Sequence, residues 1–169
     1  MSTNPNPTLF GITAPFTTLN TMPSELETNM RATTEGFVHS FDGRWTPGAT
    51  LSYRSAECKH AMLPSTLGLG TKEKSNDEWA AHFKRLDGIV TNAETTIHDY
   101  LAVPNERRAV CRTSLTADTS VGPYANDYVW FFTFDEDGRK IVSITEFMDS
   151  KAGAEMLKKL IEAGLFEKY

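Results

Sequence analysis

From about residue 90 the hydrophobic pattern of this sequence changes from a helical spacing to a period of two, and this change limits the folds open to the chain. Alternation of apolar and polar residues is typical of half-buried strands. The connections are short and carry Pro104-Asn105, Gly122-Pro123 and Asp137-Gly138. Because a parallel pair needs a crossover of about a dozen residues, the segments predict an antiparallel meander. The four expected strands are residues 93–103, 108–119, 126–134 and 140–148.

Capping signals predict two helices before these strands. Ser24 and Glu27 have the spacing of a capping box, and apolar residues then recur at three- and four-residue intervals as far as Phe41. A second capping box runs from Ser75 to Glu78. The remaining expected elements are a short helix over residues 46–53, a strand over 56–64 and a last helix over 151–163.

This order of elements predicts an α+β fold. Helices gathered near the start of the chain must cover one face of the later sheet, which makes a cone-shaped, curved antiparallel sheet around a pocket. At 169 residues the chain fits one domain that buries roughly 70% of its unfolded surface. We expect this domain over residues 27–169. Residues 1–26 are rich in Thr, Asn and Pro and predict an N-terminal arm, extended or partly disordered.

Composition excludes several classes of partner and site. The net charge of -5, without a basic stripe, argues against nucleic acid as the partner. No apolar run approaches the roughly 20 residues that cross a bilayer, and no signal-like segment is visible, so we expect a cytoplasmic protein. Cys58 and Cys111 lack a metal or redox spacing and are interpreted as reduced, packed residues. Motifs for metals, nucleotides and serine hydrolysis are absent from the sequence, so we expect no metal and no cofactor.

One carboxylate stands where the pattern calls for an apolar residue. Within 140–148, one strand face carries Val142, Ile144, Glu146 and Met148. Burial on such a face raises the pKa of a carboxyl group and makes Glu146 a candidate acid or base. The structural alternative is a strand-edge glutamate that reaches water or pairs with an arginine.

The preceding strand supplies a row of aromatic residues. Tyr128, Trp130, Phe132 and Phe134 alternate on one face, which predicts an aromatic wall of the pocket. Tyr124 lies four residues before Tyr128, so both phenols are predicted to face the mouth of the cavity. A buried tyrosine often satisfies its hydroxyl structurally, and this alternative stays open.

Three further polar residues are candidates for the site. Arg54 precedes the first expected strand, where its permanent charge can stabilise an oxyanion or form a surface ion pair. His60 shares a face with Cys58 and Met62, and His98 lies within a later strand. A lone histidine on an apolar face is more often a satisfied core residue than a ligand.

Four segments together resemble a known family. Residues 54–60, 63–68, 116–128 and 144–150 are similar to fungal SnoaL-like proteins of the nuclear transport factor 2-like superfold, and within them to natural-product isomerases such as the brevianamide-type semipinacolase and the meroterpenoid D-ring isomerases. The resemblance implies a pocket of this superfold, a homodimer formed through the outer sheet face, and a small polycyclic substrate from alkaloid, meroterpenoid or polyketide metabolism. This superfold hosts many reactions and also non-catalytic binders.

The resemblance also implies roles for individual residues. Glu146, Arg54, Tyr124 and Tyr128 match its catalytic pattern, with Glu146 as acid or base and Arg54 near the developing charge. The expected substrate-binding residues are His60, His98, Trp130, Phe132 and Met148. The expected function is a cofactor-free isomerase or cyclase. Two alternatives remain: a ligand-binding or dimeric adaptor module without chemistry, and a dehydratase that depends on His60 or His98.

Overall fold

The alternating segments form the antiparallel part of a five-stranded sheet, which an earlier strand joins at one edge. The computed structural model describes residues 22–67 and 72–166, and the order across the sheet is β1-β5-β4-β3-β2. The strands β2 to β5 are antiparallel neighbours, as the short turns predict, whereas β1 pairs with β5 in parallel. The α+β class is confirmed. The strands are β1 (Arg54–Leu63), β2 (Val90–Val103), β3 (Arg108–Thr119), β4 (Gly122–Phe134) and β5 (Ile141–Met148).

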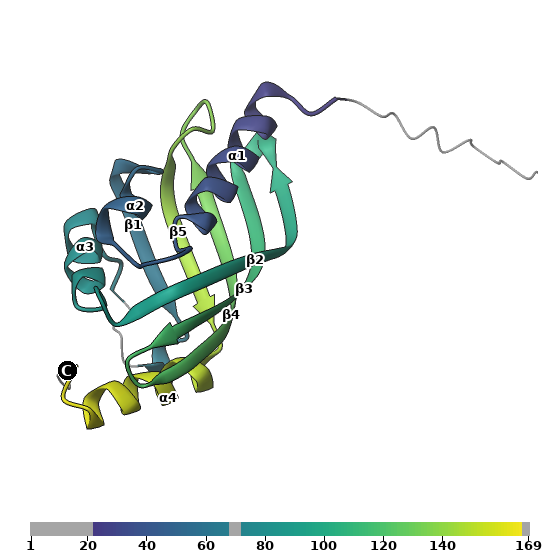
Figure 1. Ribbon diagram of the computed structural model, residues 1–169. Helices are drawn as coiled ribbons and strands as arrows, with labels where there is room; N and C mark the ends of the chain where they lie inside the picture. Colours follow the sequence, from purple (N-terminus) through teal and green to yellow (C-terminus); the bar gives the residue numbers. More distant parts are fainter. Residues whose placement is uncertain (1–21, 68–71, 167–169) are drawn as a thin grey trace, which may run out of the picture.

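Irregular register curves this sheet. In β2 the pairing shifts between Thr91 and Glu94 and again between Ile97 and Asp99, and Asn92 has a left-handed φ of 51°. Such bulges bend a strand and increase its twist. In Figure 1, β2 runs obliquely across the lower parts of the neighbouring strands, so that the sheet wraps around the helical side of the molecule.

The helices cover the concave face and one end of the sheet. Helices α1, α2 and α3 lie on one face, and α4 crosses the end at which β5 finishes (Figure 1). Ser24 Oγ accepts a hydrogen bond from the Glu27 amide at 3.1 Å, and Ser75 and Glu78 form the predicted reciprocal capping box. The helices are α1 (Glu25–His39), α2 (Pro47–Leu51), α3 (Asn76–Lys84) and α4 (Ser150–Glu162), with short 3₁₀ turns η1 (Ser65–Leu67) and η2 (Pro104–Glu106).

Several boundaries differ from the expected ones. Strand β1 begins at Arg54 and not at residue 56, and β2 begins at Val90 and not at residue 93. The expected end of the arm at residue 26 falls inside α1, which begins at Glu25, and the arm itself lies almost wholly outside the described residues. Strand β4 begins at Gly122 rather than 126, because Thr119 Oγ1 accepts from the Val121 amide and turns the chain earlier. Pro123 is tolerated at the beginning of a strand, where its missing N–H costs little. Tyr124 therefore belongs to the strand and not to the turn.

The core lies between α1 and the aromatic face of β4. Phe37 is fully buried, and its ring meets those of Trp130 and Phe132 edge-on, with centroids 5.6 and 5.5 Å away. Phe41, one turn further, stacks on Trp130 at 5.7 Å. Edge-to-face and offset aromatic pairs are favourable beyond the area they bury. Helix α1 therefore holds the aromatic wall of β4 in one position.

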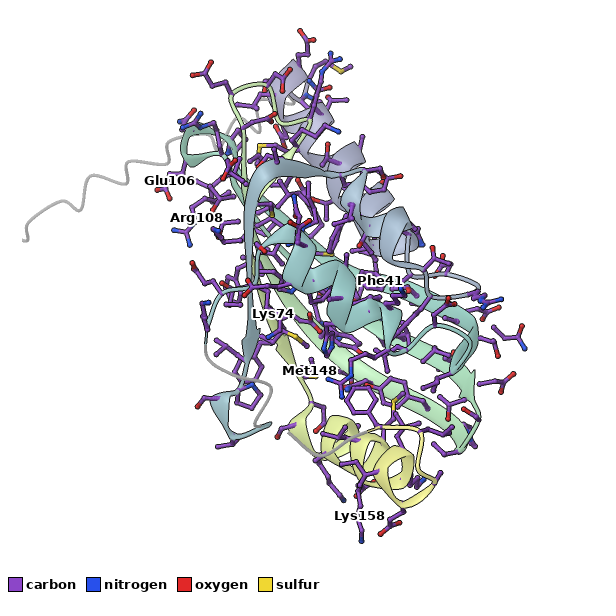
Figure 2. All side chains as sticks on the ribbon, turned by 90° about the vertical axis from the view of Figure 1, so that its left-hand side faces the viewer. Phe41, Lys74, Glu106, Arg108, Met148 and Lys158 are labelled. Atoms are coloured by element: carbon purple, nitrogen blue, oxygen red, sulfur yellow. The ribbon has the colours of Figure 1, made fainter. Side chains whose placement is uncertain are left out.

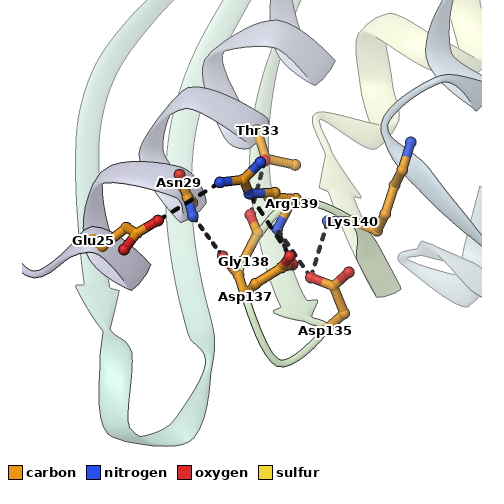
Figure 3. Close-up of polar contacts among 8 residues, drawn as sticks. All are labelled: Glu25, Asn29, Thr33, Asp135, Asp137, Gly138, Arg139 and Lys140. Atoms are coloured by element: carbon orange, nitrogen blue, oxygen red, sulfur yellow. Dashed lines mark hydrogen bonds and ion pairs between the residues drawn. The ribbon is translucent and has the colours of Figure 1, made fainter.

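The turn between β4 and β5 is fastened to the start of α1 (Figure 3). Asn29 Nδ2 donates to the Asp137 carbonyl at 2.9 Å, and Thr33 Oγ1 donates to the Gly138 carbonyl at 2.8 Å. The Asp135 carboxylate accepts from the Arg139 and Lys140 amides within the turn. These contacts fix where β5 begins, and hence the position of its side chains along the sheet.

Substituting Gly138 tests this contact. Gly138 has a φ of 75°, and a Cβ there would lie 2.9 Å from Met30 Cγ and 3.0 Å from the Leu26 carbonyl oxygen. We expect Gly138→Ala to lower the free energy of unfolding by about 1–3 kcal/mol, measured by urea denaturation. Gly43→Ala is the matched control, since Gly43 has a φ of 76° and nothing within 4 Å of its Cβ position. Equal losses in the two variants would show that the contact with α1 contributes nothing.

Candidate active site

A cavity of about 110 Å³ lies between the concave face of the sheet and the helices. Figure 2 labels two of its lining residues, Phe41 just beyond the end of α1 and Met148 at the end of β5. Most of the wall is apolar, and the polar exceptions include a carboxyl group and two phenols. The polar side chains that line the cavity are Glu146, Tyr124, Tyr128, His82, Thr95 and Thr113.

Glu146 is the carboxyl group of this cavity. Strand register places it beside Trp130 of β4 and Met62 of β1, and its side chain is almost completely buried. Burial raises the pKa of Glu146 to about 8, against the opposing charges of Lys74 and Arg54. The reason is that a carboxylate loses its hydration in this environment. Near neutral pH the group is therefore mostly protonated and still able to exchange its proton.

His60 lies directly behind Glu146 and is fully buried. Its Nε2 is 3.0 Å from Glu146 Oε2, and its Nδ1 is 3.3 Å from Arg54 Nη1. The imidazole stacks on the Trp79 indole, with centroids 3.9 Å apart and planes inclined by 17°. Burial lowers the pKa of His60 well below its usual value, and the charge of Arg54 lowers it further. His60 is consequently neutral at physiological pH.

Arg54 does not lie where an oxyanion-binding group is expected. It does not line the cavity; its guanidinium is buried on the far side of His60. The chain places Arg54 at the first residue of β1 and His60 six residues later on the same strand. Arg54 therefore reaches Glu146 through His60 and not through a shared ligand.

The two phenols form a hydrogen-bonded pair. Tyr124 Oη and Tyr128 Oη are 3.2 Å apart, and Asn126 Nδ2 donates to Tyr124 Oη at 2.6 Å. Burial raises the pKa of both tyrosines, well above the ordinary value for Tyr128. Asn126 Oδ1 accepts from the Asp149 amide at 3.1 Å, which fixes the orientation of its side-chain amide. Both phenols line the cavity as neutral hydrogen-bonding groups.

Two of the five expected substrate-binding residues line the cavity, and three do not. His60 is one of the three, because it lies behind Glu146. Trp130 and Met148 line the cavity. Phe132 is not a wall residue, because it is packed beneath α1 against Phe37. His98 is also away from the cavity: it is exposed and bonds to Ser114 Oγ at 2.7 Å. Alternate residues of a strand face opposite sides, and each bulge in β2 reverses which residues face inward. The prediction that His98 faces the cavity was therefore wrong.

Sequence reasoning missed three residues near the carboxyl group. Lys74 pairs its backbone with that of His60, and its charge opposes the rise in the Glu146 pKa more than Arg54 does. Trp79 supports His60 from α3, and His82, one turn later, lines the cavity. The spacing of Trp79, His82 and Phe83 on one helix face was a usable signal. The sequence carries no signal for Lys74, because an isolated β-bridge outside the strands brings it to His60.

Within residues 22–67 and 72–166, no group of three or more His, Cys, Asp or Glu side chains is placed to hold a metal ion. Among the helices described, none combines the length and the apolar character needed to cross a membrane.

Known proteins similar to this chain place it in a family. No family model matches the sequence. "Monooxygenase AacuP" of Aspergillus aculeatus is 33% identical over 139 residues, which cover 82% of this chain and 93% of the relative. "Austinoid biosynthesis clusters protein F" of Emericella nidulans is 32% identical over 135 residues, 77% of this chain and 73% of the relative.

Solved structures show the same fold. The BvnE pinacolase of Penicillium brevicompactum superposes with a TM-score of 0.74 at 21% identity, covering 85% of this chain and 98% of BvnE. PrhC of Penicillium brasilianum gives a TM-score of 0.75 at 20% identity over 83% and 93% of the two chains. The chain belongs to the same fungal family as AacuP and the austinoid biosynthesis proteins. Its fold is that of the nuclear transport factor 2-like proteins. These relatives support a biosynthetic enzyme role for this chain. The names "monooxygenase" and "pinacolase" among the similar proteins describe two different reactions.

The raised pKa of Glu146 predicts how stability depends on pH. A carboxyl group whose folded pKa lies above its unfolded value binds its proton more tightly in the folded state. Its stabilising contribution is complete below about pH 4.5 and is lost as pH rises to about 8. We expect Glu146→Gln to remove a decline of up to about 1.4 kcal/mol per pH unit across this window. The measurement is urea unfolding of both proteins from pH 5 to 8.5, and parallel curves would contradict a buried, protonated Glu146.

Proposed function

We propose that this protein is a cytoplasmic, cofactor-independent isomerase or cyclase that acts by acid–base catalysis on a polycyclic intermediate of fungal secondary metabolism. The observation that carries the proposal is Glu146, a buried carboxyl group with a pKa of about 8 on the wall of an apolar cavity. A general acid or base works best when its pKa lies near the operating pH. Glu146 can donate a proton to a developing alkoxide and recover one from carbon.

The phenol pair is suited to stabilise negative charge on a substrate oxygen. Asn126 donates to Tyr124 Oη, so that Tyr124 can direct its own hydroxyl hydrogen to Tyr128. The Tyr128 hydroxyl hydrogen is then available to a ligand carbonyl or alkoxide. Tyr128 lies one diagonal position from Glu146 across the β4–β5 pair. In this arrangement Tyr128 takes the oxyanion-binding role that the sequence assigned to Arg54.

The rest of the wall suits an apolar ligand. Trp130 presents its ring while its Nε1 donates to Thr113 Oγ1 at 2.9 Å, so that its only hydrogen-bond donor is already used. Met148 and Phe41 add further apolar surface. Such walls orient a ligand by shape, and a few polar groups fix its reacting atoms. A polycyclic ketone or alcohol with one reacting oxygen has these properties.

Oxygen insertion is a second candidate, favoured by the names of AacuP and nsrQ, both called monooxygenases. It shares its first step with isomerisation: Glu146 removes a proton from a carbon next to a carbonyl. The resulting enolate then reduces O₂, and a CH₂ group becomes C=O with release of one water. The substrate supplies all the electrons, so the balance needs no further reductant.

Glu146→Gln tests the proposed chemistry. In a strain that lacks the gene, we expect wild-type protein to restore the product profile and Glu146→Gln to leave the intermediate accumulated, with turnover reduced about 10²–10⁴-fold. Equilibrium dialysis should show that the variant still binds this intermediate. The control His98→Gln, altered at an exposed position outside the cavity, should restore the profile. An unchanged profile with Glu146→Gln would favour a binding module.

Isotopes separate the two reactions. Isomerisation or cyclisation proceeds without O₂ and places solvent deuterium at the carbon that exchanges its proton. Oxygenation stops without O₂ and places ¹⁸O from ¹⁸O₂ in the product carbonyl.

We also propose a homodimer formed through the outer sheet face. Phe131 of β4 and Leu101 of β2 are exposed there, and the half-buried Val110 of β3 lies between them and pairs with both. Phe147 lies on β5 beside Val129. A contiguous apolar row of this kind is typical of a face covered in an assembly. A second copy presents the same row, as a two-fold interface requires.

Charge introduced into this row tests the dimer. We expect the wild type to elute and scatter light as a dimer, and Phe131→Glu to shift it to a monomer because a buried carboxylate pair is unfavourable. Glu57→Gln, at an exposed position of β1, is a control for substitution as such. A wild-type protein that is monomeric at high micromolar concentration would contradict the proposal.

A further inference from the structure

Three side chains lie in series behind the cavity, and only the last of them lines it. Arg54 Nη1 is 3.3 Å from His60 Nδ1, and His60 Nε2 is 3.0 Å from Glu146 Oε2. Glu146 lines the cavity, whereas Arg54 and His60 do not. Any effect of Arg54 on a ligand is therefore transmitted through the imidazole.

The donors in this series have a fixed direction. A guanidinium can only donate hydrogen bonds, so His60 Nδ1 must be the acceptor and must carry no proton. In a neutral imidazole the proton is then on Nε2. The Nε2–H group donates to Glu146 Oε2, and the other oxygen, Oε1, remains to exchange a proton with a ligand.

The surrounding residues hold the imidazole in this plane. Trp79 stacks on His60, and the Arg54 guanidinium carbon lies 5.3 Å from the centre of the same indole. Trp79 is itself held by a hydrogen bond from Nε1 to Thr50 Oγ1 at 3.2 Å. The backbone of His60 is fixed on both sides, by Lys74 and by β5. Rotation of the ring, which would break both of its hydrogen bonds, is therefore opposed.

The burial of Arg54 is costly and requires an explanation. Arg54 is 4% exposed, and among the described residues neither Nε nor Nη2 has a hydrogen-bond partner within ordinary distance. The neutral Cys58 thiol is near the guanidinium and brings no carboxylate charge. The carboxylate neighbour of Arg54, Glu146, is separated from it by His60. A buried cation without a directly bonded carboxylate destabilises a fold. An effect on His60 accounts for its presence at this position.

We propose that Arg54 and His60 are positioning residues for Glu146: Arg54 imposes the Nε2–H tautomer on His60, and His60 holds Glu146 Oε2 so that Oε1 faces the ligand. This inference rests on the proposed acid–base role of Glu146. It assigns His60 no proton transfer of its own, in contrast to the dehydratase alternative. It also explains how Arg54 acts on the reaction without contacting the substrate.

Other charged and titratable groups surround Glu146 and enter its pH dependence. Lys74 acts from the segment paired with β1, and Tyr124 and Tyr128 act from β4. His82 of α3 acts on His60, and the Cys58 thiol of β1 acts on Arg54. Lys74 lowers the pKa of Glu146 more than Arg54 does. The test must therefore read the tautomer of His60 directly as well as the titration of Glu146.

The first measurement needs no substitution. In ¹⁵N-histidine-labelled protein, we expect the His60 resonances of a neutral Nε2–H tautomer from pH 8 down to pH 5.5. Signals of an Nδ1–H tautomer, or of an imidazolium within this range, would overturn the inference.

Variants then test the transmission to Glu146. Carbon-13 resonances of the Glu146 carboxyl should show an apparent pKa raised by about one pH unit in His60→Leu, which loses one hydrogen bond to the carboxylate. His60→Gln retains an N–H donor and should restore most of this change. Arg54→Met should bring the Nδ1–H tautomer into view and raise the Glu146 pKa, whereas Arg54→Lys should retain more of the original tautomer. His98→Gln should change neither signal.

An unchanged Glu146 titration in both His60→Leu and Arg54→Met would overturn the inference. Amide spectra of each variant verify folding, and a variant that fails to fold leaves the wild-type tautomer and the remaining variant as the deciding results. Because these signals require no turnover, they can fail while Glu146→Gln still abolishes the reaction. They can equally succeed if Glu146→Gln proves active, so the two failures are distinguishable.

Discussion

The hydrogen bond between His60 and Glu146 depends on one feature of the topology, the parallel pairing of β1 with β5. Strands β2, β3 and β4 come between them in the sequence, and the register of β1 with β5 sets Met62 beside Glu146 and His60 beside Ile144. A diagonal contact between neighbouring strands follows from this register. The rest of the site is arranged around it: β4 brings the phenols on one side, and α3 brings Trp79 on the other.

Burial gives these groups different protonation states. It raises the pKa of the Glu146 carboxyl and lowers that of the His60 imidazole, so that both are neutral near physiological pH. Two neutral partners joined by one hydrogen bond avoid the desolvation cost of a buried ion pair. The positive charge of Arg54 remains, and its position behind His60 is consistent with a series in which each residue orients the next. The cavity meets this series at a single oxygen of Glu146.

Local sequence signals were sufficient for most of the fold. The period of two predicted all four strands of the meander, and capping boxes predicted the starts of α1 and α3, because these depend on neighbouring residues alone. The same reasoning placed the beginning of β4 too late, since a turn containing Gly122 and Pro123 is equally compatible with a strand that begins at Gly122. The alternation also placed Glu146 on a buried face, which is where it lies.

Where the alternation is unbroken, the sequence by itself determined which strand face is buried, and it placed Glu146 on that face. Tertiary structure decided the order in which the ionisable groups meet. Arg54 lies behind His60, and Lys74 comes beside it, through contacts between segments far apart in the chain. His98 faces outward because bulges in β2 shift its register. A one-residue shift reverses the direction of a strand side chain, and alternation alone cannot locate such shifts.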